Sequence, residues 1–463
     1  MPAKNLSLSR FGRAPAWLLA LIAAQLVVGV GLGLPGHLST DSIIQLYEGR
    51  TLHFISFNPP LMSLVLGALE RLGSAPAGFV LISALLLAGG SWLALAGTAR
   101  SGMEAAQKWR RILAAGLILN PVLLVYTGIV WKDVLLAHAV LLAFMLPDTL
   151  RSAHGPGRAA GTMLLLLLLA VIIGVRQQGI LFAIPLAVCA AWRCCNGLWP
   201  RLVAILVLVA IPLATNKLAT DFAYQHGLNE LPPGGEVGLK ILMHYDLVGM
   251  LSRGAQGAGM EAGILAEMQA EIPKYSSYRV DTLDGVAVLY WSQPLARTIT
   301  MWLGEIKASP RSYAEHRLAV FSRVLGIGGV RDCLPYYRGV GGPVKHDLVS
   351  VELTALLGLT SGAGSWSRAI KGFAKVATHT PLFWHWCYLL AAAGLLLVFV
   401  RRRDWLPATL LGCTMAYMAS YAVIGIACDF RYGYVLTVAT SVMAARALLG
   451  SGRAATGQRD AHD

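Results

Sequence analysis

Charged side chains are scarce in this chain. Asp, Glu, Lys and Arg make up 13% of its 463 residues, and the mean hydropathy is +0.61. A soluble domain carries about 25% charged residues, because polar groups must coat its surface. The composition therefore excludes a soluble globule and indicates a membrane protein whose immediate partner is membrane lipid.

Cysteine motifs are also missing. The seven cysteines include no Cys-x-x-Cys pair and no Cys/His spacing typical of a zinc site. Their number is odd, and most lie in or beside apolar segments. We therefore expect small core residues and no disulfide framework.

The formal net charge of +14 would suit a nucleic-acid-binding protein. Lys and Arg, however, gather at the ends of apolar segments, where they set the orientation of membrane proteins. We therefore expect no nucleic-acid partner.

Long apolar segments recur along the chain. A hydrocarbon core of ~30 Å is crossed by a helix of about twenty residues at ~1.5 Å per residue. We predict an all-α polytopic membrane protein with ten spans, near residues 14–34, 76–98, 112–130, 134–150, 160–175, 177–193, 199–216, 382–400, 405–426 and 432–449. The first segment is long for a signal peptide and no clear cleavage site follows it, so we expect an uncleaved helix.

The segment 59–72 is short for a span and fits an interfacial helix. If it does not span, five basic residues fall in short external segments, at 50, 71, 132, 176 and 431. Seventeen fall on the cytoplasmic side, at positions 4, 10, 13, 100, 108, 110, 111, 151, 158, 193, 201, 401–403, 446, 453 and 459. This asymmetry satisfies the positive-inside rule and predicts that both termini are cytoplasmic.

Three regions follow from this topology. Residues 1–216 hold spans one to seven, 217–380 form an external domain, and 381–463 hold the last three spans and a cytoplasmic tail. Segments 286–306 and 310–324 are predicted as amphipathic helices of the external insert, and the Gly-rich run 326–342 as a loop. The Ala/Leu-rich composition, with no organelle signal, favours a bacterial cytoplasmic (inner) membrane, with the insert on the periplasmic or exterior side.

The unusual polar residues all fall on the external side in this topology. Charge at a membrane surface is unfavourable unless it is paired, so it is often functional. The external loops carry the candidate residues Asp41, Gln45, Asn58, Lys132, Asp133, Arg176, Arg431 and Tyr432.

Ordinary structural roles account for some of these residues. Asp41 could cap a helix beginning at Ser42. Lys132 and Asp133 could form an ion pair beside an anchoring tryptophan. Arg431 at a helix start is unfavourable to the helix dipole, which favours a partner or a ligand there.

The combination of elements resembles the GT-C superfamily of membrane glycosyltransferases. An acidic residue, Asp41, follows the first span, and Asn58-Pro59-Pro60-Leu61 is similar to the family's (His/Lys)-Pro-Pro-Leu element. Asp133 matches the family's second-loop acidic site. Trp-Lys-Asp and Asp-Phe-Arg-Tyr are also similar to uncharacterised bacterial members. Asn58 replaces the common His or Lys, and no Asp-x-Asp occurs in the second loop.

The resemblance implies transfer of a sugar from a polyprenyl-phosphate carrier to an external glycan, lipid or protein, with inversion at the sugar. Asp41 would be the general base. Arg176, Arg431 and Lys132 would hold the departing phosphate. Asp133 would orient the acceptor, tune Asp41, or share a divalent cation (Mg²⁺ or Mn²⁺) with it.

Three other functions remain open. A transporter or flippase would line a translocation path with the same charges. An O-antigen polymerase or ligase also combines many spans with a long external loop and functional arginines. A non-catalytic scaffold would leave the one-sided charge cluster unexplained.

Overall fold

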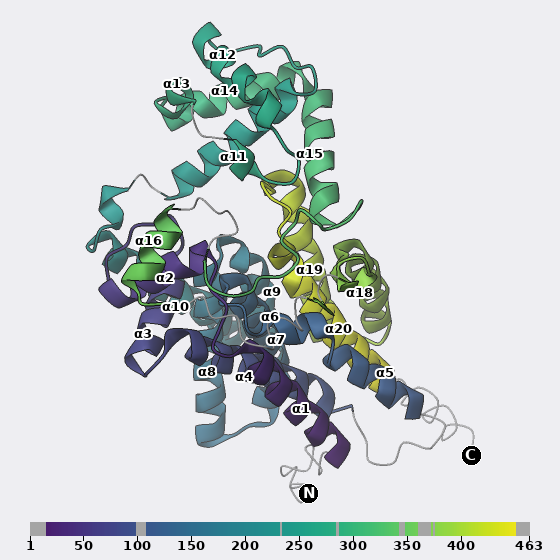
Figure 1. The fold of residues 1–463 in the computed structure, drawn as a ribbon. Coiled ribbons are helices and arrows are strands. Elements are labelled where there is room, and N and C mark those ends of the chain that lie inside the picture. The colour runs from purple at the N-terminus through teal and green to yellow at the C-terminus, as the bar shows by residue number, and fades with distance from the viewer. Residues whose placement is uncertain are drawn as a thin grey trace, which may run out of the picture.

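The computed structural model describes residues 15–98, 108–231, 234–283, 287–341, 348–359, 372–373 and 376–450. Its secondary structure is helical, without a named strand in these ranges (Figure 1). Expectations for residues 1–14, 99–107, 232–233, 342–347 and 451–463 concern residues outside this description. A helical bundle forms one end of the molecule, and the insert projects from the other (Figure 1).

Among the described residues, eight apolar helices are long enough to cross a membrane, so the chain is a multi-pass membrane protein. They are α1 Ala16–Gly33, α4 Ala75–Ala96, α5 and α6 together Lys108–Tyr126, α7 Lys132–Ser152, α8 Gly155–Val175, α10 Leu198–Tyr224, α19 Trp405–Ile424, and η8 with α20 Phe430–Gly450. The other two predicted spans form shorter helices, α9 Ile180–Cys194 and α18 His385–Arg401. Every predicted span thus corresponds to a helix, although only eight reach spanning length.

Helix α7 forms the centre of the bundle. It packs against α4, α8, α9 and α20, and 89% of its most apolar stretch is buried. In α10 only 11% is buried, so this helix presents its apolar side chains outward, toward lipid. The most buried helix therefore carries Lys132 and Asp133 at its start.

Two short helices, α2 Thr40–Thr51 and α3 Pro60–Arg71, form the loop after α1 and pack against each other. Their backbones meet at a pair of glycines. A Cβ added to Gly49 would lie 2.3 Å from the Ser63 carbonyl oxygen, and one added to Gly67 would lie 2.3 Å from that of Gly49. Glu48 accepts hydrogen bonds from the Ile55 amide and the Ser63 hydroxyl, at 3.0 and 2.6 Å. These contacts hold the helix that carries Asp41.

The insert is a helical subdomain with its own apolar core. Its helices are α11 Gly234–Leu251, α12 Ala262–Glu271, α13 Val288–Trp291, α14 Leu295–Ala308 and α15 Pro310–Val324. A further helix of the insert, α16 Leu348–Leu356, packs against α2 and places Leu353 in the core of the bundle. The prediction of a helix over 310–324 is confirmed. The prediction of one helix over 286–306 is wrong, because Pro294 has no amide hydrogen to continue a helix and stands at the N-cap of α14.

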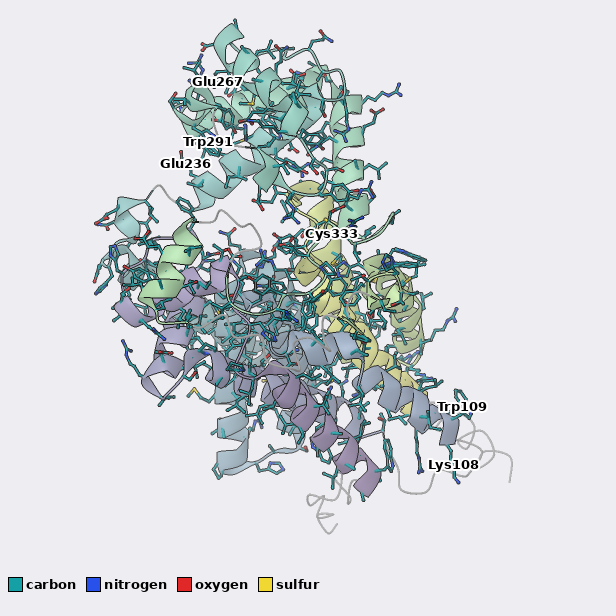
Figure 2. The ribbon with its side chains drawn as sticks, in the orientation of Figure 1. Lys108, Trp109, Glu236, Glu267, Trp291 and Cys333 are labelled. Carbon is teal, nitrogen blue, oxygen red and sulfur yellow. A yellow bond between two sulfur atoms is a disulfide. The ribbon has the colours of Figure 1, made fainter. Side chains whose placement is uncertain are left out.

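A disulfide joins the insert to the loop before the last span. Cys333 and Cys428 are bonded across 95 residues, with Cα atoms 4.9 Å apart, and Figure 2 shows Cys333 between insert and bundle. The expectation of no disulfide is therefore wrong. The other five cysteines are free.

Backbone hydrogen bonds add to this connection. The Cys428 amide donates to the Tyr278 carbonyl at 2.9 Å, and the Phe430 amide donates to the Cys333 carbonyl at 3.0 Å. The buried Arg317 of α15 donates to the Gly425 carbonyl at 2.8 Å. The insert therefore fixes the segment that leads into Arg431.

Candidate functional site

Asp41 lies in the first turn of α2 and does not cap it. The helix begins two residues earlier than expected, at Thr40, and makes no side-chain cap hydrogen bond. Asp41 instead accepts a hydrogen bond from Arg431 at 2.7 Å, while 38% of its side chain stays exposed. The capping explanation is therefore wrong, and the carboxylate remains accessible.

Arg431 lies in the short helix η8, Phe430–Gly433, just before α20. It contacts two carboxylates, Asp41 at 2.7 Å and Asp429 at 3.2 Å. Its guanidinium also stacks on the rings of Trp131 and Tyr432, 5.1 and 5.4 Å from their centroids. These contacts stabilise the positive charge of Arg431 at the start of α20, where the helix dipole disfavours a cation.

Asp133 pairs with Arg176 and not with its neighbour Lys132. Two nitrogens of Arg176 contact Asp133 Oδ1, Nε at 2.7 Å and Nη2 at 2.5 Å. The carboxylate is buried in the first turn of α7, where the helix dipole favours a negative charge. The expected Lys132–Asp133 ion pair is therefore wrong. Arg176 also lies 5.0 Å from the Tyr432 ring, which thus contacts both arginines.

Lys132 bonds to the segment between α2 and α3. Its Nζ donates to Asn58 Oδ1 at 2.5 Å. Asn58 precedes the Pro-Pro pair at the start of α3, so its position depends on that rigid turn. The Asn58 side chain therefore links Lys132 to the α3 region.

Gln45 does not join the cluster through any hydrogen bond seen in the described part of the chain. It is buried on α2, with 1% of its surface exposed, and its side-chain nitrogen has no partner among the described residues.

Two hydroxyls and an indole fix α2 against the segment between α6 and α7. Trp131 Nε1 donates to Ser39 Oγ at 2.8 Å, and Ser42 Oγ donates to the Val130 carbonyl at 2.5 Å. Isolated parallel bridges pair His37 with Ile129 in the same region. Asp41 and Asp133 thus lie on segments that are hydrogen-bonded to each other, although 92 residues separate them in sequence.

The cluster balances three carboxylates with three cations. They are Asp41, Asp133, Asp429, Lys132, Arg176 and Arg431. Burial would raise the pKa of Asp41, but the neighbouring Arg431, Lys132 and Arg176 outweigh it and lower that pKa to about 2. Burial raises the pKa of Asp429 above its usual range. The two carboxylates that share Arg431 therefore differ in acidity.

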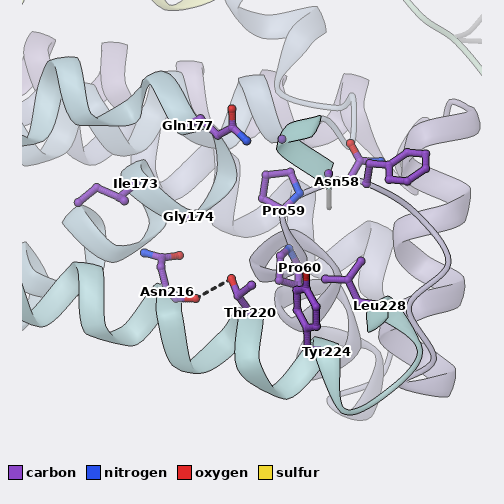
Figure 3. A pocket seen from close by; sticks show the side chains of 13 residues that line it. Asn58, Pro59, Pro60, Ile173, Gly174, Gln177, Asn216, Thr220, Tyr224 and Leu228 are labelled. Carbon is purple, nitrogen blue, oxygen red and sulfur yellow. Dashed lines mark hydrogen bonds between the residues drawn. The ribbon is translucent and has the colours of Figure 1, made fainter. Parts of the chain in front are cut away.

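A cavity of about 350 Å³ lies between α3, α8, α10 and the start of α11 (Figure 3). Residues 57–60, the end of α8, the last turns of α10 and the start of α11 form its wall. Asn58, which binds Lys132, and Gln177, which follows Arg176, both line it. The cavity thus lies between two residues that adjoin the charged cluster and α10, the helix most exposed to lipid.

The described residues contain no group of three or more His, Cys, Asp or Glu side chains that could hold a metal ion. Asp41 and Asp133 each engage a different arginine. Each arginine contacts one oxygen of its carboxylate, Oδ2 of Asp41 and Oδ1 of Asp133, and Asp133 Oδ2 has no hydrogen-bond partner among the described residues.

Sequence reasoning left two contributors out of the candidate site. Asp429 stands two residues before Arg431, and its place in the same Asp-Phe-Arg-Tyr motif was a usable signal. Trp131 was treated only as an anchor, yet its ring stacks on Arg431. The disulfide had no usable signal, because seven cysteines do not reveal their pairing.

Comparisons with known proteins add no family to this geometry. No family model matches the chain, and neither a curated protein nor a solved structure matches it.

Proposed function

We propose that this protein is an integral membrane glycosyltransferase of the GT-C type. It would move a sugar from a polyprenyl-phosphate carrier to an external glycan, lipid or protein acceptor. One observation carries the proposal: a part-exposed carboxylate, Asp41, lies in a group of three cations at the end of the bundle that bears the insert.

Asp41 is the general base in this mechanism. An acceptor hydroxyl oxygen attacks the anomeric carbon, and its proton passes to Asp41. The bond between that carbon and the carrier phosphate breaks with inversion, and the electron pair leaves on the phosphate oxygen. General-base catalysis contributes about 10²–10⁴-fold in rate.

The cations stabilise the departing phosphate. Arg431, Arg176 and Lys132 supply fixed positive charge where negative charge develops. Arginine suits phosphate because its planar fork can form two parallel hydrogen bonds. Asp133 keeps Arg176 oriented through the 2.7 Å contact.

Donor binding would activate Asp41. Without donor, Arg431 holds the pKa of Asp41 low, which makes the carboxylate a weak base. A phosphate that takes over Arg431 removes that partner, so the pKa of Asp41 rises. The base then gains strength only when the donor is present.

The cavity beside α10 supports a lipid-borne donor. Its wall reaches both Asn58, next to Lys132, and the lipid-exposed α10, so a carrier could approach from the bilayer (Figure 3). The disulfide and the excess of basic residues at the opposite end support an orientation with this face outside a bacterial inner membrane.

The test uses purified protein reconstituted in lipid, with a panel of radiolabelled polyprenyl-phosphate sugars and membrane extract as acceptor source. Wild type should release sugar from one donor, and Asp41→Asn should lose about 10²–10⁴-fold of that rate. Glu315→Gln, an exposed carboxylate on α15 in an ion pair with Arg311, is the matched control and should keep full activity.

Two results would overturn the proposal. One is full turnover by Asp41→Asn. The other is the absence of turnover with every donor, together with movement of carrier or solute across the bilayer, which would favour the transporter. Transfer of a lipid-linked polymer instead of a single sugar would favour the polymerase or ligase.

A further inference from the structure

A second basic site lies at the end of the bundle opposite the insert, where α9 ends at Cys194. Arg158 from α8 donates Nη2 to the Cys194 carbonyl at 2.9 Å. Arg201 from α10 donates Nε to the Cys195 carbonyl at 3.2 Å. Two arginines from different helices thus converge on consecutive carbonyls of one turn.

These contacts leave most of each guanidinium available. An arginine has five N–H donors in a fixed fork, and each of these two uses one on a carbonyl. Arg158 is an exposed residue. The two forks are therefore held in place while their remaining donors can bind an anion.

The surroundings carry excess positive charge. Arg193 of the same turn pairs with Asp148 at 3.1 Å, which compensates one cation. Arg151 also lies close enough to act electrostatically on Cys194. Three arginines, at 151, 158 and 201, therefore have no carboxylate partner among the described residues.

Large apolar side chains border this charge. Trp192, Leu198 and Trp199 are 52%, 62% and 77% exposed. Arg201 lies 5.2 Å from the Trp192 ring. Exposed tryptophans at helix ends are typical of the boundary between headgroups and acyl chains.

We propose that this turn binds the phosphate of an anionic glycerophospholipid. Arg158 and Arg201 would hold the phosphate, and the acyl chains would lie along the apolar face of α10, where Leu202, Val203 and Leu206 are exposed. Basic pockets between helices on the cytoplasmic side commonly bind such headgroups. The bordering tryptophans and the outward face of α10 favour a lipid over a soluble phosphate.

The experiment titrates delipidated full-length protein with phosphatidylglycerol or phosphatidylcholine of identical acyl chains. Native mass spectrometry counts the lipid retained, and thermal unfolding reports its effect on stability. Wild type should bind phosphatidylglycerol selectively, and the affinity should fall as salt rises, because exposed charges are screened.

The variant Arg158→Gln/Arg201→Gln should bind phosphatidylglycerol about ten- to thirtyfold more weakly, since each arginine contributes about 1 kcal/mol near an anionic surface. Arg401→Gln/Arg403→Gln is the matched control, because it removes the same charge from the same end of the bundle. It should leave selective binding intact.

Three results would overturn the proposal: equal retention of both lipids, equal loss in both double variants, or displacement of the lipid by inorganic phosphate at similar concentration. If the double glutamine variant fails to fold, Arg158→Lys/Arg201→Lys replaces it. That variant keeps the charge but loses the forks, so it should weaken binding while still responding to salt. Full affinity in the lysine variant would contradict the two-fork site.

Discussion

Asp41 and Arg431 are 390 residues apart in sequence and meet at 2.7 Å. Helix α2 and the segment before the last span therefore share one ion pair. The insert holds the segment before the last span in place through the Cys333–Cys428 disulfide and the Arg317 contact to Gly425. A change that loosens this connection should therefore weaken the Asp41–Arg431 ion pair.

Replacing Arg431 should change how activity depends on pH. The pKa of Asp41 is depressed to about 2, so the wild-type carboxylate is ionised at every pH where the protein is assayed. In Arg431→Gln its main cationic partner is lost while burial still raises the pKa. The acid limb of kcat/KM should therefore move to higher pH.

The measurement is the pH profile of sugar release by wild type and Arg431→Gln, compared by the position of the acid limb and not by its height. Arg311→Gln, which removes an exposed arginine of α15, is the control and should leave the limb unchanged. An unchanged acid limb in Arg431→Gln would mean that Arg431 does not lower the pKa of Asp41.

Breaking the Asp133–Arg176 pair should destabilise the bundle. Asp133 is 2% and Arg176 16% exposed, so truncating one partner leaves a largely buried charge unpaired. Such losses are about 3–5 kcal/mol for buried pairs. We expect a clearly lower Tm for Asp133→Ala in detergent, and partial recovery in Asp133→Ala/Arg176→Leu. If the double variant lost as much Tm as Asp133→Ala and Arg176→Leu lose together, the two residues would not interact.

The disulfide predicts a specific alkylation pattern. Without reductant, five cysteines should react with a maleimide after unfolding, and seven should react after reduction, because Cys333 and Cys428 are bonded. Mass spectrometry of the alkylated protein counts them. Seven reactive cysteines before reduction would contradict the bond.

Cys428→Ser should also reduce activity. Loss of a cross-link over a long loop destabilises by about 2–5 kcal/mol, and this one lies three residues before Arg431. Cys413→Ser, at a buried free cysteine, is the matched control. Sugar release that falls in Cys428→Ser but not in Cys413→Ser would link the insert to the site; equal activity in both would deny that link.

The glycine contact between α2 and α3 should tolerate no side chain. Gly49→Ala would place a methyl group 2.3 Å from the Ser63 carbonyl and push the helices apart. Overpacking of this kind costs about 1–3 kcal/mol. Gly116→Ala in α5, where a Cβ meets nothing within 4 Å, should keep or raise Tm, because alanine favours a helix over glycine by about 1 kcal/mol. Equal Tm values for both variants would mean that α2 and α3 can separate freely.

Several features were readable from the sequence because they depend on local composition. Long apolar segments located every helix of the bundle, since crossing or lining a bilayer requires length and hydropathy alone. Charge asymmetry assigned Asp41, Asp133 and Arg431 to one side. The helix 310–324 was predictable because Pro310 suits a first helical turn.

The partners within the site could not be read from the sequence. Adjacency suggested Lys132 with Asp133, yet a helix projects neighbouring side chains in different directions, and Asp133 faces Arg176 while Lys132 faces Asn58. The pairings Asp41–Arg431 and Cys333–Cys428 join segments that meet only when the spans and the insert have packed. Composition thus determined a multi-pass membrane protein with charge on one face, and tertiary packing alone decided which charges pair, because that depends on how distant helices approach.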